Sequence, residues 1–210
     1  MLHFLLGITL AWAFWELCER YAKRGLLQIN PITFLLMVIW GSSGFFLLRI
    51  FPQHRFSSVV QFFSLAVPDW DIPLSVWTGW DFLTHRSLLF NSTLLPIACI
   101  GLSCLLISLS RKSSSTNLKS KFFFLHSAIG LSVGISAHLI GDVLLNLFLY
   151  SEDIVNSIFS QNDLHTRFGF EISNQGILFS LFWVALNSLI GFAIPFAIIK
   201  LFYSRLGVKS

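Results

Sequence analysis

Five long apolar segments constrain this chain more than any other feature. They cover residues 2–17, 32–51, 88–109, 122–150 and 177–203 of the 210 residues. A helix needs about 20 predominantly apolar residues to cross a bilayer. Charged residues make up 11% of the chain, where a soluble domain has about one quarter, and the mean hydropathy is +0.75. The sequence therefore predicts an all-α fold, a polytopic membrane helix bundle of about five spans, in one domain covering residues 1–210.

The distribution of lysine and arginine predicts the orientation of the bundle. Ten of the fourteen basic residues lie in loop 18–30, loop 110–121 or the C-terminal part, all on one side of a five-span chain. Basic residues favour the cytoplasmic side. We therefore expect a multi-pass protein of the inner or plasma membrane, with the N-terminus outside, the C-terminus in the cytoplasm, and polar loops 52–86 and 151–175 outside. No basic stretch or A-x-A-like cleavage site accompanies the first segment, so we expect it to be retained.

Several function classes are disfavoured by the motifs that the sequence lacks. It has no zinc-finger spacing and no long basic run, which excludes the usual nucleic-acid modules. Its three cysteines are odd in number and have no CxxC spacing, so we expect packing residues rather than disulfides. A Gly-x-Ser-x-Gly elbow, a Walker loop and an H-E-x-x-H helix are also missing.

Polar and charged residues gather in the stretch PDWDIPLSVWTGWDFLTHRSLLFNS, residues 68–92. They are Asp69, Asp71, Asp81, His85 and Arg86. Carboxylates and imidazoles bind divalent metals, and arginine can hold a phosphate or carboxylate through two parallel hydrogen bonds. The alternatives are solvated acids in a turn, and an interface anchor like the neighbouring tryptophans. Just before this stretch, residues 56–67 could form a surface-lying or re-entrant helix.

A second polar pair lies inside the fourth apolar segment, in SAHLIGD. His138 and Asp142 are four residues apart and share one helix face with Gly130, Gly134 and Asn146. An ionisable group inside a span usually faces the bundle and has a partner. Small residues on the same face allow a neighbouring helix to approach closely. The alternative is a His–Asp hydrogen bond that only joins helices.

The predicted topology brings the two motifs to the same depth. The fourth segment rises about 1.5 Å per residue from the inside, which puts His138 and Asp142 about 24–30 Å up, in its outer part. Asp69, Asp71 and His85 are also expected on the outer side. These five residues form the predicted metal site. His126 is expected near the inner end, and His3 and His54 at the interfaces.

PDWD, HRSLLFNSTLLP and SAHLIGD, in this order, resemble the membrane-bound metal-dependent hydrolase family (YdjM-like, also described as LexA-binding inner-membrane hydrolases). The family pattern has PDxD, then HRS-x-x-THS or HRG-x-THS, then H-x-x-x-D in a later helix. The resemblance covers about residues 68–142. It implies a polytopic bundle with metal-dependent hydrolase activity.

One residue departs from the family pattern. Asn91 stands where the family has the second histidine of its HRS…HS element, and Phe90 replaces the preceding threonine. An asparagine carbonyl is a poorer zinc ligand than imidazole. Asn91 therefore leaves two alternatives, an oxygen-rich magnesium or manganese site or a degenerate site without catalysis. Possible substitutes for the missing ligand are Asp81, Glu152, Asp153 and His165.

The sequence predicts metal-assisted hydrolysis of a phosphoester or ester by a divalent zinc, manganese or magnesium ion. Asp71 would act as base and Arg86 would hold the anionic part of the substrate. A site at headgroup depth would suit a lipid or lipid-linked substrate. The main alternative is a non-catalytic protein that keeps a structural metal or His–Asp cluster and binds a partner. A transporter is a third class, but the paired broken helices or repeats typical of transporters are not seen.

Overall fold

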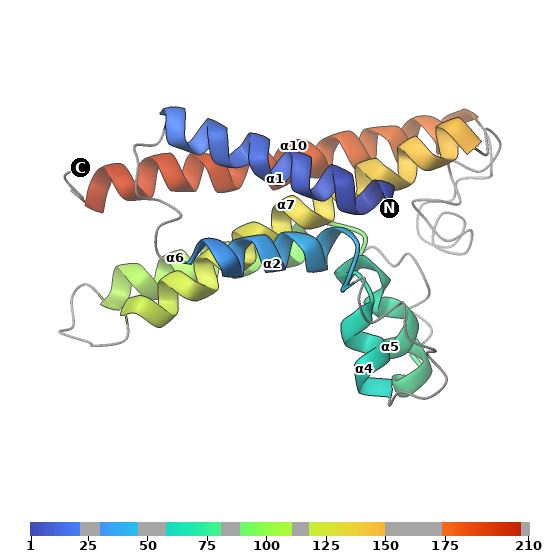
Figure 1. Ribbon diagram of the computed structural model, residues 1–210, viewed down its shortest axis with the longest axis horizontal. Helices are drawn as coiled ribbons and strands as arrows, with labels where there is room; N and C mark the ends of the chain where they lie inside the picture. The colour runs from blue at the N-terminus through green and yellow to red at the C-terminus, as the bar shows by residue number, and fades with distance from the viewer. Residues whose placement is uncertain (22–29, 46–57, 81–88, 111–117, 150–173, 207–210) are drawn as a thin grey trace.

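The computed structural model describes the chain except for residues 22–29, 46–57, 81–88, 111–117, 150–173 and 207–210. The described residues form helices and no strand, which confirms the predicted all-α fold (Figure 1). The elements are α1 (Leu2–Tyr21), α2 (Pro31–Ser42), α4 (Ser58–Ser64), the 3-10 helix η2 (Val67–Trp70), α5 (Asp71–Thr78), α6 (Leu94–Ser110), α7 (Leu118–Leu149) and α10 (Asn174–Leu206).

Among the residues that the structure describes, three helices are long and apolar enough to cross a membrane. Their apolar parts are Leu2–Arg20 in α1, Ser120–Leu145 in α7 and Leu181–Leu201 in α10. The other two predicted segments form apolar helices that are shorter, α2 with 12 residues and α6 with 17. These lengths fit a membrane protein but do not confirm the predicted count of about five spans.

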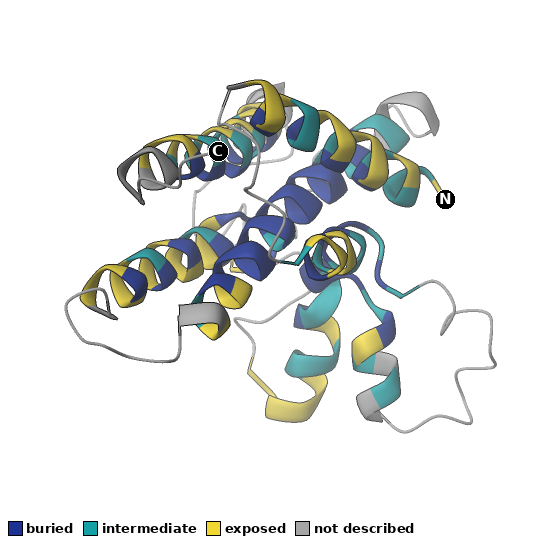
Figure 2. Cartoon of the chain, turned by 60° about the vertical axis from the view of Figure 1, so that its left-hand side comes forward, coloured by how far each residue is buried: buried dark blue, intermediate teal, exposed yellow. Residues whose placement is uncertain are grey.

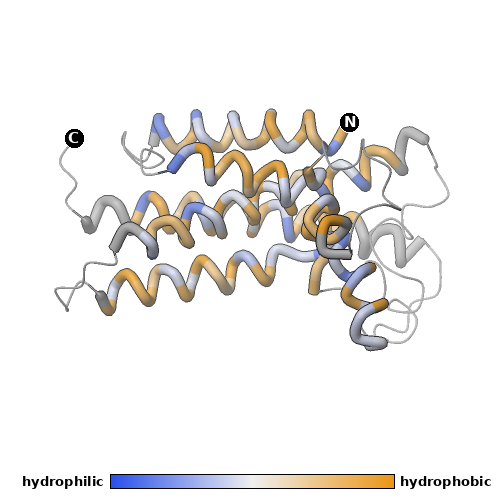
Figure 3. The backbone as a smooth tube through the Cα atoms, turned by 60° about the horizontal axis from the view of Figure 1, so that its bottom comes forward, coloured by the Kyte–Doolittle hydropathy of each residue, from blue (hydrophilic) through white to orange (hydrophobic). Residues whose placement is uncertain are grey.

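Helix α7 forms the centre of the bundle. It contacts α1, α2, α6 and α10, and 72% of its apolar part is buried, against 22% for α1 and 28% for α10 (Figure 2). The outer helices expose large apolar side chains, such as Trp12 at 68% and Leu189 at 67%, and apolar residues run along all the long helices (Figure 3). The outer surface is therefore apolar, and buried polar residues lie on the central helix. This distribution suits a lipid environment, where no water is available to solvate the outer surface.

Glycines bring α2 and α7 into close contact. A Cβ atom added at Gly134 would lie 2.5 Å from the Val38 carbonyl oxygen, and one at Gly130 would lie 2.7 Å from that of Phe34. On the facing helix, a Cβ at Gly41 would lie 3.1 Å from the Gly134 Cα. The predicted close approach along this face of α7 is therefore confirmed for both glycines. The Asn146 side chain, on the same predicted stripe, lies outside the described residues.

Sequence signals fix both ends of α2. The Asn30 side chain accepts a hydrogen bond from the Thr33 amide at 3.0 Å, and Pro31 occupies the first turn, so the helix start is capped. The helix stops at Ser42, and Gly44 then turns the chain with a φ of +71°, a conformation open mainly to glycine. The last carbonyls of α2 are thereby presented to α7.

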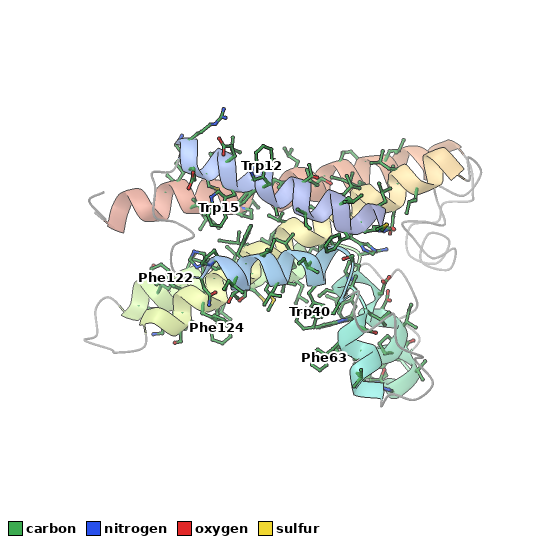
Figure 4. The ribbon with its side chains drawn as sticks, in the orientation of Figure 1. Trp12, Trp15, Trp40, Phe63, Phe122 and Phe124 are labelled. Atoms are coloured by element: carbon green, nitrogen blue, oxygen red, sulfur yellow. The ribbon has the colours of Figure 1, made fainter. Side chains whose placement is uncertain are left out.

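A small helical unit lies beside the bundle at the end where α1 begins. It consists of α4, η2 and α5, and it extends sideways from the long helices (Figure 1). Rings from both parts pack together, with centroid distances of 4.6 Å for Trp40–Trp70 and 5.7 Å for Trp40–Phe63. Figure 4 labels Trp40 on α2 and Phe63 on α4. The helix expected over residues 56–67 is represented by α4. Aromatic packing thus joins the PDWD motif to the end of α2.

Candidate metal centre

Three side chains meet at the end of the bundle where α1 begins. His3 comes from the first turn of α1, and His138 and Asp142 come from successive turns of α7. One ligand atom from each lies within 4.8 Å of the ligand atoms of the other two. The i, i+4 spacing on α7 accounts for the pair, and the packing of α1 on α7 adds the third residue. This group could hold a metal ion.

His138 is oriented by the end of α2. Its Nδ1 atom lies 2.8 Å from the Ser42 carbonyl oxygen, and the residue is only 7% exposed. A carbonyl oxygen can only accept, so Nδ1 must carry the proton and donate it. The bond also satisfies one of the carbonyls that a helix end leaves without an intrahelical partner. In the neutral ring, Nε2 then has the lone pair, which is the arrangement common in metal-binding histidines.

The Nε2 atom of His138 faces two carboxylates. It lies 3.4 Å from Asp142 Oδ2 and 4.0 Å from Asp69 Oδ1. A lone pair directed at two anionic groups is repelled by them. Positive charge is needed at this point, either as a proton on Nε2 or as a cation between the three groups. The arrangement is therefore suited to binding a cation.

His3 completes the group from the other side of Asp142. Its Nε2 atom lies 2.8 Å from Asp142 Oδ1, and its ring stacks on that of His138 with the centroids 4.7 Å apart. Gly141 leaves the space for this ring, since an added Cβ atom would lie 2.5 Å from His3 Cδ2. We expected His3 to be interfacial, without a part in the site. The structure places it in this group, and its depth in the membrane stays a prediction. The predicted topology puts the start of the first segment on the same side as the site, but no motif in the sequence marks His3 as a ligand.

One separation in the group matches the size of a divalent cation. Two ligand atoms each about 2.1 Å from one ion, at a tetrahedral angle, lie about 3.4 Å apart. The 3.4 Å between His138 Nε2 and Asp142 Oδ2 equals this value. The 2.8 Å between His3 Nε2 and Asp142 Oδ1 is a hydrogen-bond distance, which would lengthen around an ion. Two imidazoles and a carboxylate suit zinc or manganese.

The predicted ligands are brought together only in part. Asp69, on η2, lies beside His138 as described above. Asp71 begins α5 and is fully buried, but it does not belong to the group of three. His85 and Arg86 lie outside the described residues, as do the possible substitute ligands Asp81, Glu152, Asp153 and His165. The prediction that the two motifs converge therefore holds for Asp69, His138 and Asp142.

Asn91 occupies a buried position before α6 and is 2% exposed. Its main-chain carbonyl accepts a hydrogen bond from Trp183 Nε1 at 3.1 Å. Two residues later, the Thr93 amide donates to Asn187 Oδ1 at 2.9 Å. These bonds fix the start of α6 against α10. Because these bonds use the main chain of Asn91 and Thr93, they do not depend on whether the Asn91 side chain contributes to a metal site.

Comparisons with models of known protein families, with curated proteins and with solved structures found no match. The resemblance to the metal-dependent hydrolases therefore rests on the three sequence motifs. What the structure adds is the group His3, His138 and Asp142, with Asp69 beside it.

Proposed function

We propose that the chain is a membrane-bound, metal-dependent hydrolase that acts on a phosphoester or ester at the outer membrane surface. The observation that carries the proposal is the state of His138. Its Nδ1 proton is committed to Ser42, and its Nε2 atom is directed at Asp142 and Asp69. A histidine held in this tautomer among carboxylates is an arrangement that metalloenzymes use.

The proposal includes the five-span topology. In that arrangement α1, α2, α6, α7 and α10 all cross the bilayer, with the N-terminus outside and the C-terminus in the cytoplasm. The start of α1 and the end of α10 lie at opposite ends of the bundle (Figure 1), which supports an odd number of crossings. The candidate metal centre lies at the end where α1 starts, which is the outer end in this topology.

The topology can be tested by labelling single cysteines in intact cells. A cysteine replacing Ser114 should be reached only by reagents that enter the cytoplasm, and one replacing Asn162 should be reached from outside. Labelling of both from the same side would contradict the five-span arrangement.

Each residue of the site has a separate part in the proposed reaction. His3, His138 and Asp142 would hold the ion, which supplies Lewis-acid activation of a water molecule and of the substrate oxygen. Asp69 or the predicted base Asp71 would take a proton from the attacking water. Arg86 would bind the anionic group of the substrate. A substrate with a lipid anchor could reach a site at this depth from the bilayer itself.

The direct test is a hydrolysis assay with the purified full-length protein in nanodiscs. Soluble phosphoesters, carboxyl esters and phospholipids should be offered with zinc, manganese and magnesium in turn. We expect hydrolysis with at least one combination of substrate and metal. The activity should fall at least a hundredfold in Asp142→Asn, which keeps the shape of the side chain and removes its charge. Glu16→Gln, which removes an exposed carboxylate far from the site, should retain the activity.

The non-catalytic alternative rests on Asn91, the departure from the family pattern. It predicts metal binding that Asp142→Asn removes, with no hydrolysis of any substrate class by the wild type. That combination would overturn the proposed reaction and leave the metal centre in place as a structural or partner-binding site.

A further inference from the structure

Residues 58–80, which contain α4, η2 and α5, form a lateral unit whose surface differs from that of a water-facing loop. The unit lies level with the end of the bundle that holds the candidate metal centre and extends across the direction of the long helices (Figure 1). Its η2 helix contacts both α2 and α7. It is therefore a fixed part of the site's surroundings.

The lateral unit is almost without charge. Its 23 residues contain no lysine, arginine, glutamate or histidine, and its only ionisable side chains are Asp69 and Asp71. Asp71 is fully buried, and Asp69 faces His138. Apart from the partly exposed Asp69, the outward surface consequently has no charged group, although a water-exposed segment of this length normally has several.

Large apolar side chains take the place of the missing charges. Ile72 and Val76 are one helical turn apart on α5 and are 40% and 77% exposed. Trp77 and Trp80 follow at 49% and 55%, and Phe63 on α4 is 45% exposed. Tryptophan is the residue most typical of the membrane–water interface, because its ring is apolar and its N–H is polar.

The hydroxyl groups of α5 are satisfied within the helix. Ser75 Oγ donates to the Ile72 carbonyl oxygen at 2.9 Å, and Thr78 Oγ1 donates to that of Leu74 at 2.7 Å. Such bonds to the preceding turn remove the need for water as a partner. They suit a helix in contact with lipid, where an unsatisfied donor is costly.

We propose that the lateral unit lies in the interfacial layer of the bilayer, in the leaflet next to the candidate metal centre, with Val76 and Trp77 directed into lipid. A uniform apolar surface beside apolar spans continues the surface that the spans themselves present to lipid, whereas a docking site for a soluble partner usually has a polar rim. Asp69 belongs to the lateral unit and lies beside His138. The position of the unit in the bilayer interface would therefore fix the depth of the metal centre. The inference does not depend on catalysis.

The test uses the full chain with Cys18, Cys99 and Cys104 replaced by alanine and a single cysteine introduced at Val76. Val76 is exposed, so a label at this position should not disturb folding. A nitroxide label at this cysteine is examined in phosphatidylcholine–phosphatidylglycerol vesicles for collisions with oxygen, which enters lipid, and with a water-soluble nickel chelate. Leu189→Cys, on the exposed face of α10 and within its apolar part Leu181–Leu201, serves as the lipid reference. Glu19→Cys at the exposed end of α1 serves as the water reference.

We expect the ratio of oxygen to nickel collisions at position 76 to be several-fold above that at position 19 and nearer to that at position 189. A ratio equal to that at position 19 would overturn the proposal. So would spin–spin broadening at position 76 that disappears when labelled chains are diluted with unlabelled ones, because a second copy of the chain would then cover this face.

Discussion

His126 and His138 are both buried on α7, three helical turns apart, yet only one of them belongs to a candidate site. Each presents Nδ1 to a backbone carbonyl, His126 to Phe122 at 2.6 Å and His138 to Ser42 at 2.8 Å. Phe122 is one turn earlier on the same helix, whereas Ser42 is on α2. A bond to the preceding turn follows from helix geometry alone, and a bond to another helix requires the tertiary fold.

The difference shows what turns a buried histidine into a ligand. Around His138, the end of α2 supplies the acceptor, α7 supplies Asp142, and η2 supplies Asp69. Among the residues that the structure describes, the possible metal ligands form a single group of three, and His126 is not in it. Burial is therefore common to both histidines, and the converging carboxylates are not.

The largest effect is expected from Gly134→Leu, which disturbs the packing that brings Ser42 to His138. The added side chain would meet the backbone of α2, which cannot rotate away, so the cost should reach or exceed the upper end of the roughly 1–3 kcal/mol typical of overpacking. We expect little folded protein and a lower melting temperature by circular dichroism or fluorescence in detergent.

Gly101→Leu on α6 is the matched control, since no atom lies within 4 Å of an added Cβ there. Equal stability of the two variants would mean that α2 and α7 do not pack as described.

The two histidines themselves should separate in their response to metal. At a metal concentration one hundred times the dissociation constant, binding to the folded state adds about 2.7 kcal/mol of stability. His138→Ala should lose this increment, and His126→Ala should keep it, although each variant loses some packing. The measurement is the change in melting temperature of each variant on adding metal. Because this change is taken within one variant, the stability lost through packing does not enter it. Loss of the increment in both variants would remove the distinction between the two histidines.

His3→Ala should give a smaller effect, because His138 and Asp142 remain as a pair. We expect metal affinity to fall by at least tenfold, which corresponds to about 1.4 kcal/mol, measured by calorimetry with the variant in nanodiscs. Thr9→Ala, at an exposed position on the same helix, should bind metal as the wild type does. An unchanged affinity in His3→Ala would reduce the site to the α7 pair and Asp69.

The smallest effect is expected from Asn91→His, which restores the residue of the family pattern. If the resemblance is right, zinc affinity should rise, by less than the loss in His3→Ala, because the buried position leaves little room for the larger ring. Asn91→Leu is the control, because leucine is similar in volume to histidine and has no ligand atom. A gain in neither variant would place position 91 outside the metal centre.

The central helix and half of the site could be predicted from the sequence. The i, i+4 spacing of His138 and Asp142 and the glycines on the same face depend only on helix geometry, and the structure bears out the packing of Gly130 and Gly134. His3 could not be recognised by pattern, since it is a lone histidine in an apolar segment. Its role depends on how α1 crosses α7 and on the space left at Gly141. The Ser42 carbonyl, a main-chain atom, has no sequence signal at all.

The account depends most directly on whether the group His3, His138 and Asp142 binds a metal ion. The deciding measurement is the metal content of the purified full-length protein by elemental analysis, together with its melting temperature with and without a chelator. Wild-type protein should contain about one divalent ion per chain and melt lower after chelation, and the double variant His138→Ala/Asp142→Ala should do neither. Wild-type protein that contains no metal, gains none when metal is supplied, and melts identically with and without chelator would contradict the metal centre.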